Sequence, residues 1–86
     1  MIKTVKFSSE LFQGFTTQID TNDVVSIDEI IIISISILRN LLHTNNLENL
    51  VKKCDSINWH IHDKNFSQLI NCNDNIIWIC DKCVKS

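Results

Sequence analysis

The chain has 86 residues, which is enough for one domain with a single modest core but not for a deep substrate cleft between two lobes. Its formal net charge is −2, and its Lys and Arg residues are scattered among acidic neighbours, whereas a nucleic-acid-binding protein usually carries a basic stripe that neutralises several phosphates. We therefore expect one domain over residues 1–86 that does not bind nucleic acid.

Two short segments near the N-terminus are rich in β-branched and aromatic residues and predict two strands, Ile2–Phe7 and Phe15–Ile19. In the first, Val5 and Phe7 share a face because successive strand residues point to opposite sides. The connection between the segments would form a hairpin, in which Gly14 can adopt a positive φ.

The central segment begins with a capping box, since Ser26 is followed three residues later by Glu29. The next residues fit two periods, because Ile33–Ile37 alternate as in a strand. The 15 Ile residues do not decide between the periods, since together with 10 Asn and no Ala or Pro they are typical of an AT-rich genome. Length favours a helix, since the 17 residues from Ser26 to Leu42 contain no turn signal. Its apolar stripe would consist of Ile27, Ile30, Ile31, Leu38, Leu41 and Leu42, with Ser34 as the polar member. Such a helix is apolar on most sides, so its remaining Ile side chains should be buried or presented to a partner.

Signals for secretion and membrane insertion are both missing from the sequence. Lys3 and Lys6 interrupt the N-terminus before the apolar core of a signal peptide could form. Asp28 and Arg39 would be costly for a helix in hydrocarbon. We therefore expect an intracellular, cytoplasmic protein that does not bind a membrane.

A short second helix is predicted over Leu47–Cys54, because Asn45 and Glu48 have the spacing of another capping box. Its apolar face would consist of Leu47, Leu50, Val51 and Cys54, and it should cover one end of the sheet. His43 would lie at the end of the long helix, near its free carbonyls.

Two further strands are expected towards the C-terminus. In Ile57–Ile61, apolar residues alternate with Asn58 and His60, which predicts one face on the core and one in water, with Trp59 in the core. Ile76–Cys80 has no polar face and is typical of an interior strand.

The order of these elements is strand, strand, helix, strand, strand, and in the β-grasp arrangement of this order the first and last strands are adjacent and parallel. The passage Ile19–Ile30, an acidic helix start led by Asp23 and Val25, resembles the ubiquitin-like (β-grasp) superfamily over about the first forty residues. The resemblance implies an α+β fold of the form ββα(α)ββ, a roll in which a four-stranded mixed sheet packs on one long helix. The chain departs from that family after Leu42, through the short helix and the connection 63–75. It also lacks the Gly-Gly tail used for conjugation, so the resemblance implies an adaptor rather than a tag.

The cysteines offer one candidate metal site. Cys80 and Cys83 form a C-x-x-C pair whose spacing lets two thiolates bind one zinc ion. The remaining ligands would come from Cys54, Cys72, His60 and His62, and the two histidines, which point to the same side of their strand, complete the candidate set. The alternative is that Cys54, Cys72 and Cys80 are small buried apolar residues and Cys83 is a surface thiol.

No catalytic constellation accompanies the fold. The carboxylates of Asp20, Asp23, Asp28 and Glu29 gather where a helix dipole favours negative charge, and a single Gly cannot form a phosphate-binding loop. We therefore predict a protein that is not an enzyme and needs no cofactor other than the candidate zinc ion.

The function expected from the sequence is a small protein-interaction module that binds a protein partner through its sheet surface. A strand that is apolar on both faces must turn either Ile77 and Ile79 or Ile76, Trp78 and Cys80 away from the helix, and an exposed Trp78 would be an interface anchor bordered by His60 and His62. Alternatively, the short helix or the connection 63–75 covers Trp78. A zinc-stabilised domain and a self-assembling protein, such as a homodimer, are the alternative functions.

Overall fold

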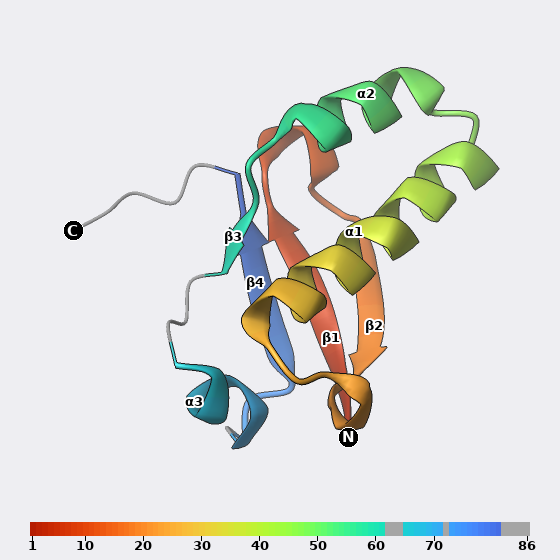
Figure 1. Cartoon of the computed structure of the whole chain (residues 1–86). Helices are drawn as coiled ribbons and strands as arrows, with labels where there is room; N and C mark the ends of the chain where they lie inside the picture. The colour runs from red at the N-terminus through yellow and green to blue at the C-terminus, as the bar shows by residue number, and fades with distance from the viewer. Residues whose placement is uncertain (62–64, 72, 82–86) are drawn as a thin grey trace.

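The computed structural model describes residues 1–61, 65–71 and 73–81 (Figure 1). Within these residues the chain forms an α+β fold with a four-stranded mixed sheet, as predicted. The strands are β1 (Ile2–Ser8), β2 (Thr16–Asp20), β3 (His60–Ile61) and β4 (Ile76–Cys80), and the α-helices are α1 (Ile27–Thr44), α2 (Glu48–Ser56) and α3 (Phe66–Asn71). Two short 3-10 helices, η1 (Glu10–Phe12) and η2 (Thr21–Asp23), lie on either side of β2 in the chain.

The strand order in the sheet is β2-β1-β4-β3. β1 is antiparallel to β2 and parallel to β4, so the first and last strands are adjacent, as the sequence predicts. β3 joins β4 antiparallel at the other edge. In this register Lys6 lies between Thr16 and Trp78, with all three side chains on the same face of the sheet.

One face of the sheet packs against α1, which crosses it in Figure 1. Val5 and Phe7 of β1 are buried, as are Ile77 and Ile79 of β4. The buried stripe of α1 consists of Ile30, Ser34, Leu38 and Leu42, which are four residues apart and so lie on one face of the helix. Trp59 joins this core, because its ring centroid lies 5.5 Å from that of Phe7 and 5.8 Å from that of Phe12.

The predicted capping box at the start of α1 is present. The Glu29 backbone N–H donates to Ser26 Oγ at 3.3 Å, and the Val25 backbone N–H donates to Glu29 Oε1 at 3.0 Å. The first bond satisfies a backbone donor that the first turn of a helix leaves open, and the second ties the residue before the N-cap to that turn. The central segment is therefore helical, and the strand alternative over Ile33–Ile37 is wrong.

The predicted second capping box is wrong. Asn45 ends α1 instead of starting α2, because its side-chain Nδ2 donates to the Leu41 carbonyl at 2.7 Å. Asn46 then takes a positive φ of 60° to turn the chain, and α2 begins at Glu48 without a side-chain cap. His43 lies in the last turn of α1, as predicted, with Nδ1 3.7 Å from Glu48 Oε1. In Figure 1, α2 lies beyond one end of the sheet.

The segment between α2 and β4 also differs from the prediction. β3 contains two residues rather than the five of Ile57–Ile61, since Ile57 still donates its backbone N–H back to the Cys54 carbonyl at 3.3 Å. Within the connection 63–75, the described residues include an unpredicted helix, α3. It is capped by Asn65, whose Oδ1 accepts from the backbone N–H groups of Ser67 and Gln68.

Candidate functional site

The sheet face opposite α1 presents Trp78 to solvent. Because strand residues alternate, the burial of Ile77 and Ile79 against α1 places Trp78 on the other side, where its side chain is 44% exposed. No helix in the described residues covers it, which favours the exposed alternative for this strand. We call this surface the open face; it consists of Ile2, Thr4, Lys6, Thr16, Gln18, Ile76 and Trp78.

A cation and a shallow hollow lie next to Trp78. The Lys6 ammonium is 5.8 Å from the centre of the Trp78 ring, within the range of a cation–π contact. Beside them is a hollow of about 360 Å³, lined by Lys6, Phe7, Ser8, Gln13, Gly14, Phe15, Thr16 and Trp78. Gly14, with φ of 89°, turns the chain at its edge, as predicted. This corner of the open face therefore offers the exposed Trp78 ring and one positive charge to a ligand.

The structure places two of the four predicted zinc ligands opposite each other. His60 and Cys80 are direct partners in the β3–β4 register, although Cys80 is only 3% exposed. Cys83 and His62 lie outside the described residues. Within residues 1–61, 65–71 and 73–81, no three His, Cys, Asp or Glu side chains gather as a metal site would require.

Cys54, which could have supplied a further zinc ligand, lies apart from this pair in the core. It is 1% exposed on α2, and burial, followed by the nearby Asp55 carboxylate, raises the pKa of its thiol. A thiol in that state is a poor ligand and a poor nucleophile. Cys54 thus has the character of a small buried apolar residue; Cys72, the other reserve ligand, lies outside the described residues.

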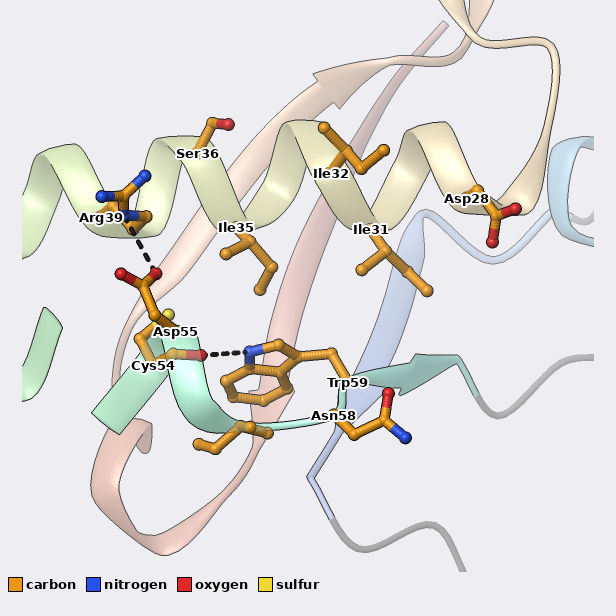
Figure 2. A pocket seen from close by; sticks show the side chains of 11 residues that line it. Asp28, Ile31, Ile32, Ile35, Ser36, Arg39, Cys54, Asp55, Asn58 and Trp59 are labelled. Carbon is orange, nitrogen blue, oxygen red and sulfur yellow. Dashed lines mark hydrogen bonds and ion pairs between the residues drawn. The ribbon is translucent and has the colours of Figure 1, made fainter. Parts of the chain in front are cut away.

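Sequence reasoning missed a groove on the helical side of the molecule. It lies between α1 and the segment that leads from α2 into β3, and it measures about 590 Å³ (Figure 2). We call it the α1 groove; it is lined by Asp28, Ile31, Ile32, Ile35, Ser36, Arg39, Cys54, Asp55, Ile57, Asn58 and Trp59.

Opposite walls of the α1 groove are apolar. Ile31 and Ile35 point from α1 towards the ring of Trp59, as Figure 2 shows. The Trp59 indole N–H donates to the Cys54 carbonyl at 3.2 Å, which fixes the ring against the end of α2. At one end of the groove, Arg39 Nε lies 3.1 Å from Asp55 Oδ1, and at the other lies Asp28.

The sequence contains part of the signal for this groove. Ile32 and Ile35 lie outside the predicted core stripe, and a partner-facing surface was expected from such leftover Ile residues. Ile32 is indeed 63% exposed. What periodicity cannot supply is the opposite wall, because it depends on where the segment after α2 crosses α1.

Comparison with protein-family models, with curated proteins and with solved structures gives no match for this chain. In the described part of the chain, none of the helices has the length and apolar character needed to cross a membrane. The candidate surfaces are therefore assigned from the geometry of the molecule alone.

Proposed function

We propose that this chain is a non-enzymatic protein-interaction module of the ubiquitin-like (β-grasp) type, which binds a protein partner through its open face with Trp78 as the anchor. The observation that carries the proposal is the 44% exposure of Trp78 in the middle of a sheet face that no described helix covers. An exposed ring marks an interaction site when it belongs to a wider apolar area, and Ile2 and Ile76 lie on the same face of the sheet.

Strand order supports the β-grasp part of the proposal. The first and last strands are parallel neighbours at the centre of the sheet, and the long helix that follows the first hairpin crosses one face. A fold of this kind leaves its second face without helical cover. The additional helices α2 and α3 are insertions relative to ubiquitin itself.

The surroundings of Trp78 fit an interface anchor. Tryptophan buries a large area at low conformational cost, and such residues dominate binding energy when they lie in a desolvated centre. The neighbouring hollow, which Phe15 also lines, gives a partner side chain a place to insert. Ile76, on the same strand and face, extends the apolar area, and His60 borders it on β3.

A comparative capture experiment tests the proposal. Wild-type protein, Trp78→Ser and a control variant, Val25→Ser, are immobilised and exposed to lysate of the source cells, and retained proteins are quantified by mass spectrometry. Val25 is 81% exposed and lies outside both surfaces, so it matches the chemical change without touching the open face. A partner should be retained by the wild type and by Val25→Ser, and reduced at least about tenfold by Trp78→Ser.

Equal retention by Trp78→Ser would contradict the proposal. Native mass spectrometry under reducing conditions then separates the alternatives. A zinc adduct that is lost on acidification would support a zinc-stabilised domain built on Cys80, Cys83, His60 and His62. A metal-free dimer would support a self-assembling protein.

A further inference from the structure

The α1 groove lies on the helical side of the molecule and takes no part in the proposed use of the open face. Its volume of about 590 Å³ is within the range of roughly 300–1,000 Å³ typical of ligand sites. It is open along its length, so a compact small molecule would leave much of its own surface in water. An extended ligand that contacts both walls over several groups fits this shape better.

The charges along the groove are not balanced. Arg39 is engaged by Asp55 at 3.1 Å, and Glu29 accepts from the Val25 backbone N–H in the helix cap. Asp28 is different: its carboxylate lines the groove, and no cation pairs with it among residues 1–61, 65–71 and 73–81. The charges of the lining residues Asp28, Arg39 and Asp55 sum to −1. The negative charge without a cationic partner in the described part of the chain lies at the Asp28 end of the groove.

The apolar wall of the groove is already rigid before any ligand binds. Trp59 is held by its bond to the Cys54 carbonyl, by an edge contact with the Phe7 ring and by a tilted contact with the Phe12 ring. A wall that is fixed in advance lowers the ordering cost of binding. Ile31 and Ile35 face it from a capped helix, which is also a rigid element.

We propose that the α1 groove binds a short basic and apolar peptide segment of a partner protein. Large apolar side chains of the segment occupy the space between Ile31, Ile35 and Trp59, and a Lys or Arg pairs with Asp28. Asp28 and Arg39 are eleven positions apart on α1, which corresponds to about 16 Å along the helix axis. An extended segment of about five residues covers that distance.

Peptide display tests the proposal. A library of random peptides is selected on wild-type protein, and enriched peptides are synthesised and titrated. We expect a Lys or Arg close to large apolar residues in the enriched sequences. Binding should weaken about tenfold in Asp28→Lys, because an attraction becomes a repulsion, and should weaken with added salt.

The matched control is Asp23→Lys, an exposed residue outside the groove that undergoes the same change of charge. It should alter affinity by less than about twofold, since an exposed charge that does not line the groove is largely screened by water and salt. Ile32→Ser, a change at the exposed edge of the groove, should also weaken binding, and a folded circular dichroism spectrum confirms that each variant is intact. Enrichment of acidic peptides, no enrichment, or equal weakening by Asp28→Lys and Asp23→Lys would overturn the inference.

The two tryptophans give a separate readout for each surface. Trp59 and Trp78 are the only two in the sequence, so their indole N–H resonances report the groove and the open face respectively. The peptide should shift the resonance of Trp59 and leave that of Trp78 in place; the Trp78→Phe variant assigns the two signals. A shift at Trp78 alone would overturn the groove proposal while supporting the use of the open face.

Discussion

Lys3 shows how a single residue can depart from the pattern around it. It lies on the same face of β1 as Val5 and Phe7, and it is 1% exposed. Its ammonium donates to the Asp74 carbonyl at 2.8 Å, which ties β1 to the turn that precedes β4. The neighbouring Thr4 backbone N–H donates to the Asn75 carbonyl at 2.8 Å, so the bonds from Lys3 and Thr4 hold the same turn against β1. A buried ammonium is tolerable only because such acceptors replace water.

Lys3→Met should lower the free energy of unfolding by about 1–3 kcal/mol, since the charged hydrogen bond to Asp74 is lost while most of the apolar stem is kept. Urea denaturation of the two proteins measures the difference. Lys52→Met on the exposed side of α2 is the control, and its effect should remain within about 0.5 kcal/mol. If Lys3→Met were as stable as the wild type, the interactions of the ammonium would do no more than offset the cost of burying its charge.

The sequence predicts part of this arrangement. Alternation places Val5 and Phe7 on one face, and the same rule puts Lys3 there, but no local pattern distinguishes a buried lysine from an exposed one. The acceptor is 71 positions away in the chain. Such a contact follows from the parallel pairing of β1 with β4, which strand propensity does not specify.

At the scale of elements, α1 is specified locally at its start. The two bonds between Ser26, Glu29 and Val25 fix where the helix begins, and the buried stripe follows from its period. Ser26→Ala should lower the free energy of unfolding by about 1 kcal/mol, because the Glu29 backbone N–H loses its acceptor. Thermal unfolding checks this.

Two further variants show whether the loss of stability comes from the helix cap. Ser26→Asp should restore most of the stability, since a carboxylate also caps a helix and suits its dipole. Ser36→Ala, on an exposed position of the same helix, should leave stability unchanged or slightly higher, because Ala has the better helix propensity. Equal losses from Ser26→Ala and Ser36→Ala would mean that the cap is not needed.

The other elements show where local signals compete. Asn45 has the spacing of a helix start, yet it ends α1, because an Asn side chain can serve the last carbonyls of one helix as well as the first amides of another. Asn65 carries the same kind of signal before α3, and there it does start a helix. Spacing alone does not separate the two uses. In the candidate zinc site, His60 and Cys80 are register partners because β3 pairs with β4, which the C-x-x-C spacing does not specify.

At the scale of the whole molecule, the α1 groove arises from elements that the sequence predicts separately. Ile31 and Ile35 follow from the helix, and Trp59 follows from its predicted place in the core. Their separation is set by the turn after α2 and by the bond from Trp59 to Cys54, which no periodicity encodes. The open face, by contrast, follows from alternation once one face of β4 is covered.

The open face also makes the two tryptophans differ in solution. Trp59 is 7% exposed and Trp78 is 44% exposed, so acrylamide quenching of the wild type should reveal an accessible and a protected fraction of the fluorescence. Trp78→Phe should remove the accessible fraction and shift the remaining emission to shorter wavelength.

Because the proposed use of the open face is to bind a different protein, the accessible fraction should stay constant across a wide range of protein concentration. A fraction that falls as concentration rises would mean that copies of the chain cover Trp78 in one another. Light scattering on the same samples would then show the increase in mass, and self-assembly would replace partner binding as the use of this face.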